Sequence, residues 1–412
     1  DLAERGYQLD GSGDGGSTVK ITVVGLGKIG LPLAVQYARK RHSVIGADVN
    51  VTTVDLVNNA TEPFSGEHLL QEYLTDVVSA GLLTATTDTR SAVSVSDAVV
   101  VAVPLLVDDD AVPDFRAMDE ATRAIGKGLQ GGTLVSFETT LPVGTTRSRL
   151  TPILESRSGL EASREFFVAF SPERVFTGRV FADLRRYPKL VGGIDPTSTK
   201  RAVAFYRSVL DFDERNDLAR PNGVWDLGSA EEAEFAKLAE TTYRDVNIGL
   251  ANQFATYADR AGLDVHKVIE ACNSQPYSHI HQPGIAVGGH CIPVYPRLYL
   301  WNDPGSSIVA AAREANLAMP GYATGVLEST LGSIEGLEVL VLGAAYRGGV
   351  KETAFSGVFD LVEILRLKGA IVSVHDPLYT EEELSGLGLP PSSSWDSVGA
   401  LILQANHPEY LE

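Results

Sequence analysis

KITVVGLGKIG, residues 20–30, decides the fold of this chain of 412 residues. Its apolar, β-branched beginning predicts a buried strand over 20–24. Three glycines with the spacing G-x-G-x-x-G follow this strand, and a helical pattern continues over 29–40. A second strand is predicted over 43–47, and it ends at Asp48. Strand, glycine turn, helix, strand and acid are typical of a dinucleotide-binding βαβ unit.

Each glycine of this turn has a physical reason. Gly25 permits the tight turn, Gly27 lets a pyrophosphate approach the backbone, and Gly30 lets the helix pack on the strand. An acid at Asp48 accepts the ribose hydroxyls and repels a 2′-phosphate, so we predict NAD rather than NADP. A glycine turn without a ligand is the competing interpretation. The predicted cofactor contacts are Gly25, Gly27, Lys28, Ile29, Gly30 and Asp48, with Val103, Pro104 and Thr140 after later strands.

Further strands are predicted over 98–103, 133–137 and 166–170, alternating with helices. This alternation predicts a mainly parallel sheet. The pattern changes at 229–260, which holds no proline and only Gly249 as a glycine. We predict one long helix there, roughly 48 Å at 1.5 Å per residue. Ser229 and Glu232 have capping-box spacing at its start, and Gly262 is a plausible stop.

Two shorter helices around a Pro-rich loop are predicted to complete the middle region, to about Met319. The opening theme then recurs as a strand over 338–342, a helix over 356–368 and a strand over 370–374 before Asp376. We therefore predict an α/β protein with two Rossmann-like doubly wound domains, joined by a helical middle domain with one long central helix. The predicted boundaries are a flexible tail at 1–18, then domains at 19–222, 223–322 and 323–412.

Composition narrows the function further. The chain has 34 Lys and Arg against 53 Asp and Glu, a net charge of −19, which argues against binding nucleic acid or anionic membrane. Its two cysteines make a disulfide framework improbable and fit a reducing cytoplasm. The apolar stretch over 98–107 is too short to span a bilayer, and we expect no signal peptide. No Cys/His spacing typical of zinc occurs, so no metal is predicted.

Several segments carry candidate chemistry, each with a plainer alternative. Cys291 follows two glycines in VGGHCIP, residues 287–293, which would let a ligand approach the thiol. A lone cysteine is more often a small buried hydrophobe, as we expect for Cys272. Lys237 lies mid-helix, where lysines are usually solvated. Thr140 in TTLPVGTT and Glu173 in SPERV follow strands and face the ligand edge, unless they serve only as turn or cap residues.

These segments together resemble the UDP-glucose/GDP-mannose dehydrogenase family. The resemblance runs from about Lys20 to the C-terminus. It rests on GLGKIGLPLA, TTLPVGTT, FSPERVFTGR, AKLAETTYRDVNIGLAN, PGIAVGGHCIP, VLGAAYRGGVKET and VHDP. GGHCIP after a long helix with a lysine is its most specific part. The SPERV and TYRDVNI segments resemble the branch that acts on UDP-N-acetylhexosamines such as UDP-N-acetylmannosamine.

The resemblance implies a function and assigns residue roles. The family oxidises a sugar C6 alcohol to a carboxylate with two NAD per turnover. Cys291 would trap the aldehyde as a thiohemiacetal, Lys237 would stabilise the developing oxyanion, and Thr140 and Glu173 would hold or activate water. The C-terminal domain would bind the nucleotide. The implied substrate contacts are Glu173, Arg174, Val175, Lys237, Thr241, Asn247, Tyr277, His279, His281, Gly288, Gly289, Tyr346 and Arg347.

Four positions depart from the family pattern. Thr241 replaces an Asn and Tyr295 replaces an Asp, while Tyr277 and Ala354 stand where the family has Arg. Each lost charged hydrogen bond is worth about 1.5–3 kcal/mol. We therefore predict a substrate pocket altered from the family pattern. Arg347, Lys351, His279 and His281 are candidates for compensation.

Three other interpretations compete with a four-electron nucleotide-sugar 6-dehydrogenase. A two-electron dehydrogenase would stop at the aldehyde or ketone because Tyr295 and Thr241 impair proton transfer. A non-catalytic binder of dinucleotide and sugar nucleotide would explain the missing charges, but would not need Lys237 and Cys291. A short-chain epimerase or dehydratase would need Tyr-x-x-x-Lys, which is absent. We also predict a homodimer through the long helix.

Overall fold

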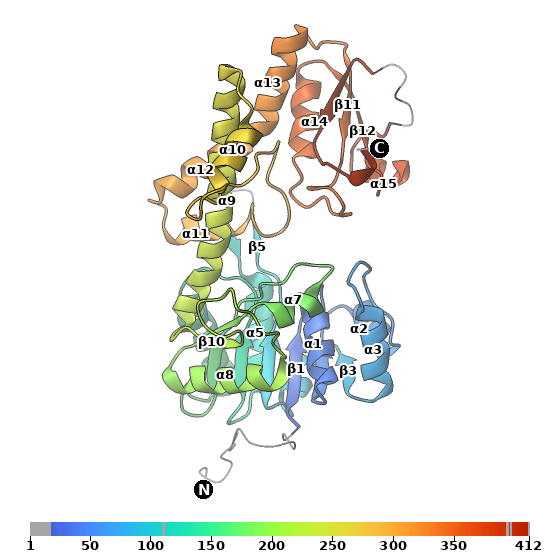
Figure 1. The fold of residues 1–412 in the computed structure, drawn as a ribbon. Coiled ribbons are helices and arrows are strands. Elements are labelled where there is room, and N and C mark those ends of the chain that lie inside the picture. Colours follow the sequence, from blue (N-terminus) through green and yellow to red (C-terminus); the bar gives the residue numbers. More distant parts are fainter. Residues whose placement is uncertain (1–17, 109–111, 393–394, 396–397, 411–412) are drawn as a thin grey trace. The chain divides into compact units, whose positions relative to one another are not determined.

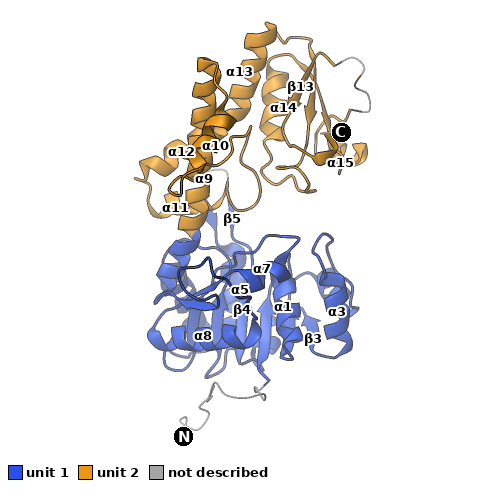
Figure 2. Ribbon diagram, in the orientation of Figure 1, with its two compact units in different colours: residues 1–237 blue, residues 238–412 orange. Residues whose placement is uncertain are grey.

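The computed structural model describes residues 18–108, 112–392, 395 and 398–410 (Figure 1). Residues 1–17 of the predicted flexible tail lie outside this part of the chain. The chain divides into two compact units, residues 1–237 and 238–412 (Figure 2). Each unit is considered by itself.

The first unit is built on a sheet of eight strands among the described residues. Their order across the sheet is β10-β9-β8-β7-β4-β1-β2-β3. The strands are β1 (Lys20–Val24), β2 (Ser43–Ala47), β3 (Leu83–Thr86), β4 (Ala98–Val101), β7 (Leu134–Phe137), β8 (Phe167–Phe170), β9 (Lys189–Gly193) and β10 (Val224–Asp226). All neighbours pair in parallel except β8 and β9, so the predicted mainly parallel sheet is confirmed.

Helices cover this sheet. They are α1 (Gly30–Arg39), α2 (Val51–Asn58), α3 (Leu70–Ser79), α4 (Thr89–Val93), α5 (Arg116–Gly128), α6 (Thr151–Ser158), α7 (Val180–Arg186) and α8 (Pro196–Val209). A π-helical turn (Thr146–Leu150) precedes α6, and the short strands β5 (Leu106–Val107) and β6 (Pro113–Asp114) pair with each other. Every residue of β4, β7 and β8 is buried, as expected for strands covered on both faces.

The long helix α9 (Ala230–Ala261) has 32 residues, which confirms the prediction. Its start is the expected capping box: the Glu232 N–H donates to Ser229 Oγ, and the Ser229 N–H donates to Glu232 Oε2. Gly262 follows its end with a φ of 69°, a left-handed conformation that glycine adopts without strain. The boundary between the two units falls inside this helix, after Lys237.

The prediction of two shorter helices before Met319 is wrong. The described residues form three, α10 (Val265–Asn273), α11 (Tyr295–Asn302) and α12 (Ser307–Leu317), followed by α13 (Met319–Leu331). The pair Pro304-Gly305 separates α11 from α12, because a proline cannot donate to a continuing helix.

The second unit ends in a small parallel sheet, with the order β12-β11-β13 among the described residues. Its elements are β11 (Glu338–Leu342), α14 (Val358–Leu367), β12 (Ile371–His375), α15 (Glu381–Gly386), β13 (Ala400–Leu403) and a 3-10 turn (Pro408–Tyr410). The predicted return of the strand, glycine turn, helix and strand pattern is confirmed. None of the helices described in either unit combines the length and apolarity needed to cross a membrane.

Candidate active site

The glycine turn between β1 and α1 leaves its backbone around Gly27 exposed. Gly25 has a φ of 92°, and a Cβ on Gly30 would lie 1.8 Å from the Gly25 carbonyl oxygen. A Cβ on Gly27 would instead meet nothing within 4 Å. Gly27 and Lys28 are exposed and Ile29 is half-buried at the start of α1. The backbone here is therefore accessible to a phosphate at a helix N-terminus, which fits a dinucleotide.

Asp48 and the strand ends beside it face the same edge of the sheet. One carboxylate oxygen of Asp48, Oδ2, accepts the Leu26 N–H at 2.7 Å, so this acid also fixes the glycine turn. The Val103 carbonyl oxygen accepts the Thr139 hydroxyl at 2.6 Å, which joins the loops after β4 and β7. Thr140 is buried and Pro104 is exposed. The order of β1 and β4 in the sheet makes this edge the switch point where such folds bind ligands.

Glu234 ties the loop that carries Thr140 to the helix that carries Lys237. Its carboxylate is fully buried and accepts the N–H of Gly144 at 2.5 Å. Its other oxygen accepts the Thr146 N–H at 2.9 Å and the Thr146 hydroxyl at 2.7 Å. Burial raises the pKa of Glu234 to about 7, and it outweighs the hydrogen bonds, which act to lower this pKa.

This pKa predicts a pH-dependent stability. The folded chain holds the Glu234 proton more tightly than the unfolded chain, so stability is highest below the ordinary pKa of 4.5 and falls as the pH rises to about 7. The loss is about 3 kcal/mol at most. Urea unfolding of wild type and Glu234→Gln at mildly acidic and mildly alkaline pH measures it. We expect wild type to lose stability toward alkaline pH relative to Glu234→Gln, while Glu72→Gln, at an exposed site, follows wild type. A difference between wild type and Glu234→Gln that is independent of pH would contradict the prediction.

Glu173 belongs to a buried cluster of charges rather than standing alone. Lys189 Nζ donates to Glu138 Oε2 at 2.6 Å and to Glu173 Oε2 at 2.9 Å. The side chains of Lys189, Glu138 and Glu173 are 4%, 0% and 9% exposed. Glu173 also lies within electrostatic reach of Lys237, which is itself buried on α9. The structure thus brings Glu173 and Lys237 into one charged environment.

The cysteine loop is built against the loop after β11. Gly289 donates its N–H to the Ala354 carbonyl oxygen at 2.8 Å. A Cβ on Gly288 would lie 2.3 Å from Tyr346 Cβ, so only glycine fits there. Cys291 itself is exposed, and its carbonyl oxygen accepts the Tyr295 N–H at the start of α11. The glycines therefore serve close packing that presents an exposed thiol.

Other predicted substrate contacts are placed in the second unit. Asn247 on α9 donates to the His279 carbonyl oxygen at 2.6 Å and accepts the His281 N–H at 2.9 Å, so its amide shapes that loop. Tyr277 on the same loop is 92% exposed. Thr241 is buried, and its hydroxyl donates to the Leu238 carbonyl oxygen of its own helix.

Two candidates for compensating charge differ in their surroundings. Arg347 is exposed and lies 5.8 Å from the Tyr346 ring centroid. Lys351 is paired with Glu383, with Nζ to Oε1 at 2.6 Å. Arg174 and Val175, after β8 in the first unit, are half-buried; the Arg174 guanidinium donates to the Pro188 carbonyl oxygen.

Sequence reasoning missed the residues that hold this site. Glu138 directly follows an apolar strand, a signal that could have marked it as a buried functional carboxylate. Lys189 opens a strand and Glu234 lies in a helix, positions where charged side chains are usually solvated. The recurring pattern also predicts that Asp376 mirrors Asp48. Asp376 accepts the Ala344 N–H after Gly343, as Asp48 accepts the Leu26 N–H after Gly25, but Asp376 is also buried and accepts the Ala345 N–H.

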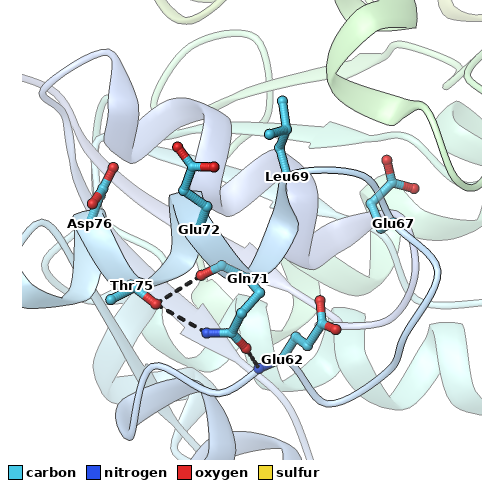
Figure 3. A pocket seen from close by; sticks show the side chains of 7 residues that line it. All are labelled: Glu62, Glu67, Leu69, Gln71, Glu72, Thr75 and Asp76. Atoms are coloured by element: carbon cyan, nitrogen blue, oxygen red, sulfur yellow. Dashed lines mark hydrogen bonds between the residues drawn. The ribbon is translucent and has the colours of Figure 1, made fainter.

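An acidic hollow beside α3 is lined by none of the residues predicted for the site (Figure 3). The hollow is lined by Glu62, Glu67, Leu69, Gln71, Glu72, Thr75 and Asp76. Its four carboxylates would repel the phosphates of a nucleotide. Glu67 has a structural task, because it accepts the N–H groups of Gly178 and Val180. Over the described residues, no group of three His, Cys, Asp or Glu side chains is arranged to hold a metal ion.

Comparison with known proteins identifies three matching segments. Residues 19–210, 231–317 and 340–412 match the NAD binding, central and UDP binding domains of the UDP-glucose/GDP-mannose dehydrogenase family. The UDP-N-acetyl-D-mannosamine dehydrogenase of Pyrococcus horikoshii is 34% identical, over 95% of this chain and 90% of that protein. The NDP-N-acetyl-D-galactosaminuronic acid dehydrogenase of Ralstonia solanacearum is 32% identical, over 84% and 79%. The structure of a UDP-glucose dehydrogenase from Pyrobaculum islandicum superposes with a TM-score of 0.85 at 27% identity, covering 97% of this chain and 92% of that one.

Proposed function

Because this chain belongs to the UDP-glucose/GDP-mannose dehydrogenase family, we propose that it oxidises the C6 alcohol of a UDP-sugar to the uronic acid. It is an NAD-dependent nucleotide-sugar dehydrogenase. The sugar we propose is a hexose or N-acetylhexosamine, because several relatives are named as UDP-N-acetyl-D-mannosamine dehydrogenases. The observation that carries the four-electron assignment is the exposed thiol of Cys291 on its packed glycine loop.

The first unit would hold the cofactor at the glycine turn. Gly25, Gly27 and Gly30 shape this turn, and the N-terminus of α1 faces the pyrophosphate. Asp48 would accept the ribose hydroxyls beside its bond to Leu26. Lys28, Ile29, Val103, Pro104 and Thr140 complete the proposed contacts. When bound, NAD supplies the hydride acceptor for both oxidation steps.

Cys291 would make the reaction a four-electron one. The alcohol first loses a hydride and a proton to give the aldehyde. The Cys291 sulfur adds to the aldehyde carbon, forming a C–S bond and a thiohemiacetal hydroxyl. Loss of a second hydride and a proton gives a thioester. Water then adds to this carbonyl, the C–S bond breaks, and the carboxylate and the free thiol are released.

The first unit would supply the polar groups for these steps. Lys237 is buried within electrostatic reach of Glu173, and its ammonium would stabilise the substrate oxygen as negative charge develops. Thr140 and Glu173 would hold the water. In the second unit, the sugar nucleotide would contact Gly288, Gly289, Tyr346 and Arg347. The other proposed substrate contacts are Arg174, Val175, Thr241, Asn247, Tyr277, His279 and His281.

The substrate pocket would differ from that of the family. Ala354 has no polar side chain, and its backbone is bonded to Gly289 and Glu352, while Tyr295 occupies the first turn of α11. A kcat/KM series over UDP- and GDP-sugars, followed by NADH absorbance, tests the substrate class. We expect the highest value for a UDP-hexose or UDP-N-acetylhexosamine. A clear preference for GDP-mannose would contradict the proposal.

A homodimer through α9 is the proposed assembly, in the cytosol where NAD and nucleotide sugars are available. Tyr243, Leu250, Phe254 and Tyr257 lie on one side of the helix by their spacing and are 62%, 45%, 38% and 60% exposed. Such an apolar stripe is typical of a surface covered by a second subunit.

The dimer can be tested by light scattering at micromolar concentration. We expect a dimer for wild type and a monomer for the double variant Leu250→Glu/Tyr257→Glu, because two buried carboxylates oppose association. Leu367→Glu on α14, whose side chain is 80% exposed, is the control and should remain dimeric. A monomeric wild type would refute the proposal.

A further inference from the structure

The reversal of one strand places a lysine at the ligand edge of the first unit. β9 runs antiparallel to β8, so its first residue, Lys189, lies where β7 and β8 end. Glu138 follows β7 directly, and Glu173 follows β8 by three residues. One buried ammonium thereby meets two carboxylates, at 2.6 Å and 2.9 Å.

The two carboxylates are not held in the same way. Glu138 Oε1 also accepts the Tyr206 hydroxyl at 2.7 Å and the Tyr37 hydroxyl at 3.2 Å, so Glu138 is fixed from the core side. Glu173 Oε1 accepts the N–H of its neighbour Arg174 at 2.7 Å, and Oε2 accepts Lys189. Lys189 thus helps to fix the orientation of Glu173.

The charges around Glu173 favour its ionised form. Burial acts to raise the pKa of Glu173. The charge of Lys189, the hydrogen bonds from Lys189 and from the Arg174 N–H, and the charge of Lys237 together outweigh burial and lower this pKa. The pKa of Lys189 is raised by the two carboxylates, despite its burial. The groups that face Glu173 electrostatically are Lys189, Lys237, Glu138 and Tyr37.

We propose that Lys189 is a positioning residue, which keeps Glu173 ionised and in one orientation within electrostatic reach of Lys237. This inference rests on the proposed function and deepens it. A carboxylate held in its charged form is a weak proton acceptor at neutral pH. Glu173 would therefore act by orienting water and the Lys237 ammonium, and would stop acting when the pH falls low enough to protonate it.

The pH profile of kcat tests this role. In Lys189→Met, Glu173 loses the cation that is hydrogen-bonded to it, so the acidic limb should move to higher pH by about one unit or more, which is tenfold or more in activity on that limb. Lys189→Arg keeps the charge and should restore the limb. Tyr206→Phe, which removes hydrogen bonds to Glu138 and Ser136 but none to Glu173, should lower stability and leave the limb in place. An unmoved limb in a folded Lys189→Met would overturn the proposal.

A second variant keeps the test possible if Lys189→Met does not fold. Lys189→Met/Glu138→Gln removes the charges of Lys189 and Glu138 together, so only Glu173 is left as a buried carboxylate without the lysine, where Lys189→Met alone leaves two. We expect this double variant to fold where Lys189→Met alone fails, and to show the shifted limb. A folded double variant with the wild-type limb would equally overturn the proposal.

A second measurement needs no turnover. Urea unfolding of wild type, Lys189→Met, Glu173→Gln and the variant with both changes forms a double-mutant cycle. The coupling between the two residues should be present at neutral pH and should be lost as the pH falls below the ordinary pKa of 4.5 and through the lowered pKa of Glu173. A wild type without turnover would refute the proposed function alone, whereas a cycle without coupling would refute the role of Lys189.

Discussion

Cys291→Ser should abolish formation of the uronic acid. A serine hydroxyl in place of the thiol is a far weaker nucleophile at neutral pH, so the aldehyde would no longer be captured for the second hydride step. We expect the rate of carboxylate formation to fall by about a thousandfold or more, since this covalent step is lost outright. Mass spectrometry of the product, with NADH counted per sugar consumed, measures the effect.

The chain provides a matched control for this variant. Cys272 on α10 is the other of its two cysteines and is half-buried, so Cys272→Ser makes the same chemical change away from the glycine loop. Its activity should stay close to wild type. Acid production by Cys291→Ser at the wild-type rate would rule out the covalent mechanism.

Lys237→Ala should have the second-largest effect. Removing one preorganised donor to a developing oxyanion typically lowers kcat by about a hundredfold to a thousandfold. The Lys237 ammonium is buried, so water replaces it poorly. We expect kcat to fall by this amount while the KM for NAD changes little, because Lys237 lies on α9 and not at the glycine turn.

The control for this second variant is another helical lysine. Lys267 on α10 has a side chain that is 82% exposed, and Lys267→Ala should retain wild-type kcat. Steady-state rates with saturating sugar nucleotide compare the two variants. A kcat for Lys237→Ala within about fivefold of the wild-type value would exclude the oxyanion role.

Local pattern was enough to predict most of the fold. The strands at 20–24, 43–47 and 338–342 match their predicted bounds because β-branched runs between polar turns leave little ambiguity. The 32-residue helix was visible from the lack of breakers. The break between α11 and α12 was missed, although Pro304 and Gly305 mark it. The predicted domain boundaries after 222 and 322 stay predictions.

The candidate site was predictable only where a residue carries its own signal. The glycine turn and the cysteine loop have such signals in sequence. Lys189 does not, because its partners Glu173 and Glu138 lie 16 and 51 residues away, and only the reversed strand brings them together. Glu234 likewise lacks a local signal, because Gly144 and Thr146, to which it bonds, lie 90 and 88 residues away in the sequence. Contacts of this kind arise from tertiary packing.

The stoichiometry of NADH to sugar tests the central claim most directly. Wild-type protein would be given a limiting amount of its best UDP-sugar with excess NAD, and the product identified by mass spectrometry. The four-electron mechanism predicts two NADH per sugar and a carboxylate. One NADH per sugar, with an aldehyde or ketone as the product, would contradict it.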